Sequence, residues 1–199
     1  MHTIIDGGDY ADMLFKDIVA EDTVFEGIRF EGCTFRQCHF DRSTFSRCRF
    51  RDCEFIDCHL DLIRIGGTLF AESRFTDCRM LGIDWTRGHW PSVQLPETLR
   101  FERCLLNDSS FFGLRLEGIR LLACRALNVD FTDADCADAD FAGTELRDAM
   151  FRHTRLTGAN FVDAIDYTID IRQNDVRRAR FSLPEAASLL RGLDIDLVE

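Results

Sequence analysis

Phenylalanine recurs along this chain every five residues, and this period constrains the fold more than any other feature. Seventeen of the 18 phenylalanines lie on one five-residue lattice that slips once by a single residue, and only Phe112 is off it. The first register holds Phe15, Phe25, Phe30, Phe35, Phe40, Phe45, Phe50, Phe55, Phe70 and Phe75, and the second holds Phe101, Phe111, Phe131, Phe141, Phe151, Phe161 and Phe181. Helices repeat every 3.6 residues and strands every two, so neither explains this period. A long fixed period indicates a solenoid, which usually serves as a binding surface.

Other apolar residues fill the gaps in this lattice. Leu60, Met80 and Trp85 are examples of residues that take the central position where phenylalanine is absent. Two residues before each central position lies a second series of small or apolar residues, such as Cys38 and Cys58. The other three positions of each five are mostly charged or polar. Two of every five residues are therefore predicted to face inward and three outward.

This pattern predicts a coil with corners. If five residues make one side and four sides close a turn, residues 20 apart stack, and their backbones pair at about 4.8 Å. Each buried Phe or Leu contributes roughly 1.5–3 kcal/mol. One coil cannot hide its own hydrophobic face, so stability must come from the stacking of neighbouring coils.

The repeats carry a family resemblance. Residues 139–143 (Ala-Asp-Phe-Ala-Gly), 154–158 and 159–163 resemble the A(D/N)LXX unit of pentapeptide-repeat proteins, and the resemblance extends over about residues 10 to 181. It implies an all-β fold, a right-handed quadrilateral parallel β-helix of four pentapeptides per coil. Residues 30–38, 90–93 and 179–187 resemble the antibiotic-resistance members that protect DNA gyrase, closest to the albicidin-resistance type.

Length and charge limit the domain organisation and the class of partner. We expect a β-helix over residues 1–181 with a register break near 96–100, and a helix with a tail over 182–199 that acts as cap and dimerisation segment. The net charge of −11, from 35 acidic and 24 basic residues, argues against direct binding of nucleic acid or an anionic membrane and favours a basic partner. The chain has no run of about 18 apolar residues and no signal pattern, so we expect a cytoplasmic protein.

Residues that often carry chemistry have structural explanations here. Eight of the nine cysteines belong to the small inward series and Cys136 is central, so we interpret them as reduced core residues. His39 and His59 occupy the same position in successive predicted coils and should stack on an outer face, more as a solvated pair than as a metal site. The sequence shows no nucleophile beside a base and no glycine-rich phosphate loop. We therefore expect no catalytic residues, no cofactor and no metal.

The break between the two registers leaves two interpretations open. It contains Trp90, Pro91, Pro96 and Glu97, and the two prolines each remove a backbone donor from the ladder. The segment is either a local bulge that accommodates an insertion, or a projecting contact or flexible joint. Larger family members carry projecting loops that matter for gyrase protection, whereas this chain has no long loop.

Acidic residues supply the candidate partner-binding surface, and all of them occupy predicted outward positions. They are Asp108, Asp130, Asp133, Asp135, Asp138, Asp140, Glu145 and Asp148. Asp108, Asn128 and Asp148 are spaced by 20 and should form a column that presents negative potential to a protein built to hold DNA. An ordinary solvated surface is the alternative.

The density of charge limits how much of the surface can mimic DNA. A rod of about 40 Å would match DNA carrying about 24 charges, so the chain's charge suffices only if it is concentrated on one face. We place that face in the second half, because Arg42, Arg47, Arg49 and Arg51 make the first half less acidic.

The C-terminal segment is predicted to form a short helix. Ser182 is the expected cap, Pro184 lies in the first turn, Glu185 takes the third position and Gly192 is a plausible stop. Such a helix either closes the last coil or forms a two-fold interface. The resemblance implies both, because gyrase-protecting members dimerise tail to tail. The expected interface residues are Leu183, Leu189, Leu190, Leu193, Ile195 and Leu197.

Composition alone supports an acidic, non-enzymatic binding rod. The resemblance implies more: a homodimer that mimics DNA, binds DNA gyrase or a related type II topoisomerase, and protects it from a poison such as albicidin or a quinolone. Two alternatives stay open. One is a general protein–protein interaction scaffold, and the other is direct sequestration of a toxin or antibiotic.

Overall fold

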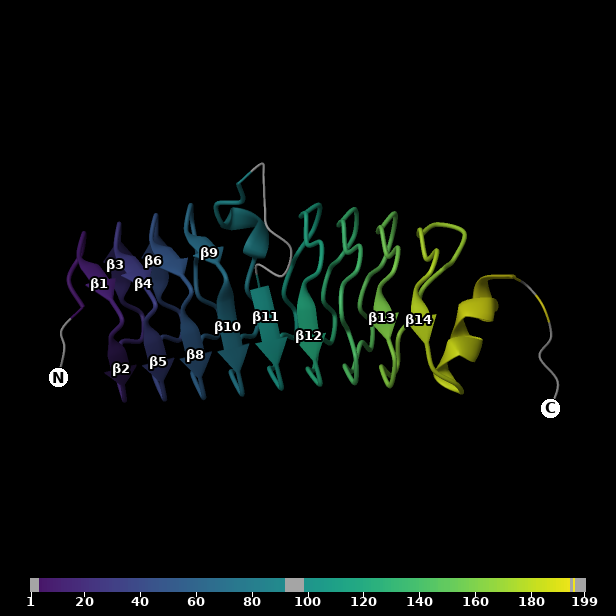
Figure 1. Cartoon of the computed structure of the whole chain (residues 1–199), viewed down its shortest axis with the longest axis horizontal. Coiled ribbons are helices and arrows are strands. Elements are labelled where there is room, and N and C mark those ends of the chain that lie inside the picture. The colour runs from purple at the N-terminus through teal and green to yellow at the C-terminus, as the bar shows by residue number, and fades with distance from the viewer. Residues whose placement is uncertain (1–3, 92–98, 194, 196–199) are drawn as a thin grey trace.

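Short parallel strands wind around a common axis in this protein. The computed structural model describes residues 4–91, 99–193 and 195. Figure 1 shows a parallel β-solenoid of about eight turns with a short helix at its C-terminal end, so the predicted all-β quadrilateral β-helix is confirmed. We number its four sides 1 to 4 in chain order.

Each side is a ladder of strands or isolated bridges between successive coils. Side 1 contains β1 (Asp9–Ala11), β4 (Arg29–Glu31), β7 (Arg49–Arg51) and β9 (Leu69–Ala71). Side 2 contains β2 (Leu14–Lys16), β5 (Thr34–Arg36), β8 (Glu54–Ile56), β10 (Ser73–Thr76), β11 (Leu99–Glu102) and β12 (Arg120–Leu122), and continues into β13 (Asn160–Phe161) and β14 (Arg180–Phe181). Side 4 begins with β3 (Val24–Glu26) and β6 (Thr44–Ser46), and side 3 is held by bridges such as His39 with His59.

The central residues of the repeat stack into aromatic ladders inside the coil. On side 2, the ring centroids of Phe15 and Phe35 lie 5.0 Å apart and those of Phe35 and Phe55 lie 4.7 Å apart, with nearly parallel planes. Phe161 and Phe181 end the same side at 5.0 Å. Aromatic pairs of this kind contribute about 0.5–1.5 kcal/mol beyond their buried area. The ladder therefore couples each coil to the next.

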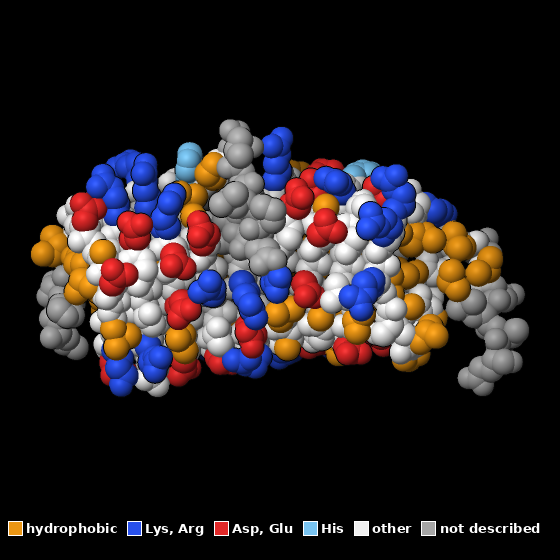
Figure 2. All heavy atoms as spheres, in the orientation of Figure 1, with side chains coloured by type: hydrophobic (Ala, Val, Ile, Leu, Met, Phe, Trp, Pro, Cys, Tyr) orange, Lys and Arg blue, Asp and Glu red, His pale blue; other side chains and the backbone are white. Residues whose placement is uncertain are grey.

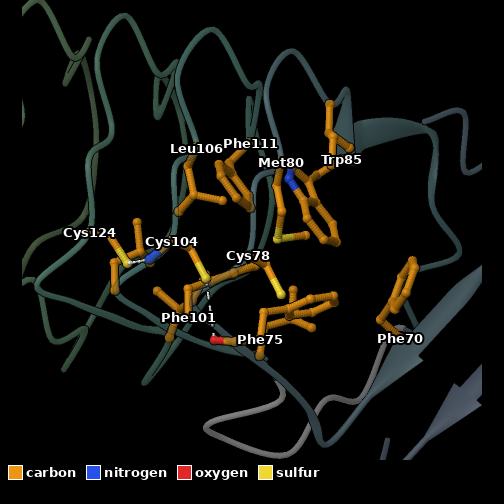
Figure 3. Close-up of a cluster of buried hydrophobic side chains, with 14 of the residues drawn as sticks. Phe70, Phe75, Cys78, Met80, Trp85, Phe101, Cys104, Leu106, Phe111 and Cys124 are labelled. Atoms are coloured by element: carbon orange, nitrogen blue, oxygen red, sulfur yellow. Dashed lines mark hydrogen bonds between the residues drawn. The ribbon is translucent and has the colours of Figure 1, made fainter. Parts of the chain in front are cut away.

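The small inward series includes a column of five cysteines, and all nine cysteines of the chain are free and buried. The column consists of Cys38, Cys58, Cys78, Cys104 and Cys124. Its thiols donate to backbone carbonyls: the Sγ of Cys58 lies 3.4 Å from the oxygen of Phe35, and the Sγ of Cys104 lies 3.4 Å from that of Phe75 (Figure 3). These thiols fill space beside the rings and satisfy their donors within the core.

The register break is an insertion of six residues into one coil. β10 pairs with β11 so that Phe75 faces Phe101, whereas the uninterrupted period would bring position 95 opposite Phe75. Before the insertion, the 3-10 helix η1 (Trp85–Arg87) begins after Asp84, whose carboxylate accepts a hydrogen bond from the amide of Thr86. Figure 1 shows η1 at the upper edge of the coils, in teal. The predicted contact residues Pro96 and Glu97 lie outside the described residues.

The C-terminal helix η2 (Glu185–Leu193) differs in detail from its predicted form. It is a 3-10 helix that begins after Pro184 and runs through Gly192, so the predicted stop was wrong. At the start, the backbone carbonyl of Ser182 accepts a hydrogen bond from the Ala186 amide at 3.0 Å. The Ser182 hydroxyl does not cap the helix by accepting from its amides but accepts a hydrogen bond from the Asp163 amide, at 2.8 Å. Ser182 therefore ties the helix to the last coil. No helix among the described residues is long and apolar enough to cross a membrane.

Candidate partner-binding surface

The predicted acidic residues are distributed around the rod. None of the eight carboxylates is in the core, but the five-residue period places successive ones on different sides. Asp130 bridges along side 4, Asp135 along side 1, Asp140 along side 2 and Glu145 along side 3. The dense run in the sequence is therefore not one dense patch in space, and Figure 2 shows acidic and basic side chains mixed on the face that it presents.

Three of these carboxylates hold the turns of the solenoid. Asp130, Asp135 and Asp140 directly precede central residues, and each accepts a hydrogen bond from the amide two residues further on, at 2.9, 3.2 and 3.2 Å. This is the Asx-turn arrangement that aspartate and asparagine favour. The sequence signal for this role is the position of each aspartate directly before a central residue, which the count of acidic residues did not take into account.

The corners explain another group of acidic residues. The second residue after a central position has positive φ throughout most of the coil, including Asp108, Asp133, Asp138 and Asp148, with φ between 53° and 60°. Aspartate and asparagine tolerate this left-handed conformation better than most side chains. These residues are exposed, so they meet a backbone requirement while presenting charge to solvent.

Three of the corner residues form the column that their spacing in the sequence predicts. Asn128 lies between Asp108 and Asp148, and its Nδ2 donates to the Asp108 Oδ1 at 3.1 Å. Neither Asp108 nor Asp148 forms a salt bridge with another described residue. Asp133 and Asp135, by contrast, have basic residues beside them in the next coil: the Asp133 carboxylate lies 3.4 Å from the Nδ1 of His153, and the Asp135 carboxylate lies 2.9 Å from the guanidinium group of Arg155.

Glu145 is the least available of the predicted contacts. Its side chain is only 18% exposed, and its two oxygens face Arg125 at 3.0 Å and Arg147 at 2.8 Å. Arg147 also reaches Asp166 at 3.0 Å. The carboxylate of Glu145 is therefore occupied within the protein, whereas the column of Asp108, Asn128 and Asp148 faces solvent.

The tryptophans at the break have different environments. Trp85 is fully buried and stacks on Phe111 with ring centroids 5.6 Å apart. Trp90 is half-buried, and its Nε1 donates to the Trp85 carbonyl at 2.8 Å. Pro91 is also half-buried. Trp90 thus packs against the coil instead of extending fully into solvent.

The predicted residues of the C-terminal segment differ in burial. Leu189 packs against the core and Leu190 is half-buried, as a cap requires. Leu183 is 84% exposed, and Leu193 and Ile195 are also exposed. Hydrophobic side chains gather over this end of the rod in Figure 2. Leu197 lies outside the described residues.

The histidines form a surface pair. The rings of His39 and His59 lie 4.3 Å apart on side 3, as their equivalent positions in the repeat predict. His59 Nδ1 is 3.9 Å from the Asp41 carboxylate. Within the described ranges, no group of three or more histidine, cysteine or acidic side chains is placed to hold a metal ion.

Fold and surface together define a parallel β-solenoid with a filled core and charged outer columns. Residues 28–111 and 83–161 match the family described as pentapeptide repeat region, so the chain belongs to the pentapeptide repeat family. No curated protein matches the sequence.

Solved structures of QnrB1, described as a plasmid-mediated fluoroquinolone resistance protein, share the fold. One trypsin-treated variant has a TM-score of 0.82 and 18% identity, with all of both chains covered. A second trypsin-treated variant has a TM-score of 0.72 and 17% identity, covering 96% of this chain and 100% of the other. At these identities, the similarity establishes the architecture alone.

Proposed function

We propose that this protein binds DNA gyrase or a related type II topoisomerase as a DNA mimic and protects it from a poison. The observation that carries the proposal is the column of Asp108, Asn128 and Asp148, which presents solvent-facing acid along a rod with the fold of QnrB1. Positively charged side chains that bind DNA phosphates would bind these carboxylates. A gyrase partner would also place the protein in the cytoplasm.

The mimicry is local and does not extend over the whole surface. Asp130, Asp135 and Asp140 serve turns, and Glu145 is paired with arginine, so the remaining charge is concentrated at corners. A local column still gives an electrostatic attraction that weakens as salt rises. Salt-insensitive binding would favour the alternative of a general interaction scaffold.

A dimer would lengthen the mimic. The exposed Leu183, Leu193 and Ile195 lie beyond the last coil, where a two-fold contact would join two rods end to end. At about 4.8 Å per coil, the pair of solenoids would span roughly 80 Å. Such a length suits a two-fold enzyme groove better than one rod does.

The test uses gyrase supercoiling and drug-induced DNA cleavage, with albicidin and with a fluoroquinolone. We compare the wild type with Asp108→Asn/Asp148→Asn, because asparagine at position 128 shows that this corner accepts the amide. The control is Asp17→Asn/Asp57→Asn, which removes the same number of charges from a corner column in the first half. In that column Gln37 donates to Asp57 at 3.3 Å, and Asp17 also lies 3.6 Å from Lys16.

The proposal predicts protection by the wild type and the control, and a several-fold weaker effect for the Asp108/Asp148 variant in low salt. Equal protection by both variants would show that this column is not the contact. Absence of protection with every poison would reject the gyrase assignment. Binding of the drug by the protein alone, seen by calorimetry without gyrase, would instead support sequestration.

A further inference from the structure

A shallow hollow on side 1 has a charge opposite to that of the protein as a whole. It is lined by Arg29, Phe30, Glu31, Arg49, Arg51 and Leu69. These residues belong to β4, β7 and β9, which are neighbours in one parallel ladder. The three arginines are exposed, so their guanidinium groups are accessible from solvent.

The neighbours of Arg49 leave its charge uncompensated. The ladder places Arg49 directly between Arg29 and Leu69, and like charges on facing strand positions destabilise a sheet. Arg29 has a counter-charge of its own, because it reaches the two oxygens of Asp9 at 3.0 and 3.2 Å. Asp9 therefore compensates the charge of Arg29 and not that of Arg49.

Arg51 is in a similar position on the same strand. It faces Glu31 in one neighbouring coil and Ala71 in the other, and only the first of these is charged. Neither Arg49 nor Arg51 forms a salt bridge with any residue that the structure describes. The pair therefore offers guanidinium donors that no internal acceptor occupies.

The spacing of these donors suits a small oxyanion. Facing strand positions are about 4.8 Å apart and alternate residues on one strand are roughly 6.6 Å apart, so the side chains of Arg29, Arg49 and Arg51 leave the backbone at three neighbouring points around the hollow. A guanidinium group is a planar fork that binds carboxylate or phosphate through two hydrogen bonds. Two or three such forks can contact one bound anion.

The charge balance selects among the possible anions. Three arginines set against Asp9 and Glu31 leave one net positive charge, which matches a single carboxylate better than a doubly charged phosphate. A nucleic acid would also bring many phosphates towards a chain of net charge −11. We infer that this hollow binds an acidic side chain of a partner protein, with Arg49 and Arg51 as the principal donors.

This inference goes beyond the proposed function, in which the protein supplies the carboxylates. It is tested on the isolated chain, so its outcome is independent of gyrase. The probe is a capped Gly-Glu-Gly peptide, titrated while the arginine Nε–Hε signals are followed by NMR. A capped Gly-Gln-Gly peptide and a thymidine hexanucleotide are titrated in the same way.

We expect the glutamate peptide to produce saturable shifts at Arg49 and Arg51, and the glutamine peptide to produce none. The variant Arg49→Gln/Arg51→Gln should bind several-fold more weakly, whereas Arg152→Gln/Arg178→Gln, which changes two exposed arginines elsewhere, should bind as the wild type does. Shifts spread equally over Arg152 and Arg178 would overturn the inference. Tighter binding of the oligonucleotide than of the peptide would overturn it as well.

Discussion

Phe75 and Phe101 stack with ring centroids 5.1 Å apart and planes inclined by 13°, although the insertion lies between them in the chain. The preceding step of the same ladder, from Phe55 to Phe75, contains no insertion, and its ring centroids lie 4.8 Å apart. The core therefore continues across the insertion with little change in stacking.

This continuity makes Phe101 a critical core residue. Replacing it with alanine removes a fully buried ring that contacts Phe75 and Trp85, and we expect the free energy of unfolding to fall by about 3–5 kcal/mol. Phe112→Ala is the matched control, because that ring is 48% exposed, and it should change stability by less than about 1 kcal/mol. Urea denaturation followed by circular dichroism measures both, and equal losses would contradict the ladder's role.

A deletion of residues 92–97 separates the two interpretations of the insertion. It restores the regular five-residue period, so we expect the solenoid to fold and the thermal midpoint to stay within a few degrees of the wild type. Thr98 would then occupy a corner that requires positive φ, so the variant also carries Thr98→Gly. Unchanged gyrase protection would identify a bulge, and lost protection in a folded variant would identify a contact.

The five-residue lattice predicted the sides, the inward residues and the stacking partners, because close packing inside a narrow coil leaves little freedom. The lattice failed to predict burial where a charged residue occupies a central position. Asp166 takes the central lattice position but is exposed, and Tyr167 beside it is buried 5.7 Å from both Phe161 and Phe181. An unpaired carboxylate in the core would cost several kcal/mol, so the adjacent residue fills the space.

The acidic surface was harder to predict for a different reason. Sequence density suggested one patch, whereas the corners direct neighbouring acids to different sides, and the hydrogen bond from Thr132 to Asp130 depends on backbone geometry. The hollow formed by Arg49 and Arg51 depends on which residues occupy the adjacent coils. A single count of charge along the chain contains neither relationship.

The backbone at Leu62 provides a test of corner strain. This residue has φ of 56° and a side chain that is 54% exposed, so it is an aliphatic residue in a conformation that asparagine adopts more easily. We expect Leu62→Asn to raise the free energy of unfolding by about 0.5–1 kcal/mol. Leu14→Asn, at equal exposure but in β2, should lower it or leave it unchanged. The reverse order in thermal denaturation would show that the corner is not strained.

The buried thiols predict a loss of stability in alkali. Burial raises the pKa of Cys53 to about 12 and also raises the pKa values of Cys33 and Cys48. In the unfolded chain these thiols ionise near pH 9, whereas in the folded chain they stay protonated to higher pH. Their contribution to the free energy of unfolding is therefore complete below pH 9 and declines as the pH rises towards 12. The slope is at most about 1.4 kcal/mol per pH unit for each thiol.

Denaturant titrations between pH 7 and 11 measure this decline, and Cys53→Ala should reduce its slope. Ellman's reagent gives an independent check at pH 8, where the folded protein should react slowly and the unfolded chain should expose nine thiols. Rapid reaction of several thiols in the native state would show that the buried cysteines are accessible to the reagent.

Apolar side chains are exposed at both ends of the rod, and only those at the C-terminal end belong to the proposed dimer interface. Leu183 and Leu193 are exposed at the C-terminal end, while Leu14 and Val19 are exposed at the N-terminal end. If the proposed tail-to-tail dimer forms, light scattering coupled to gel filtration should give about twice the 22.9 kDa of one chain. Leu183→Asp/Leu193→Asp should shift that mass to the monomer, because two buried carboxylates would face their symmetry mates. Leu14→Asp/Val19→Asp should leave the dimer intact, and the opposite pattern would move the interface to the first coil.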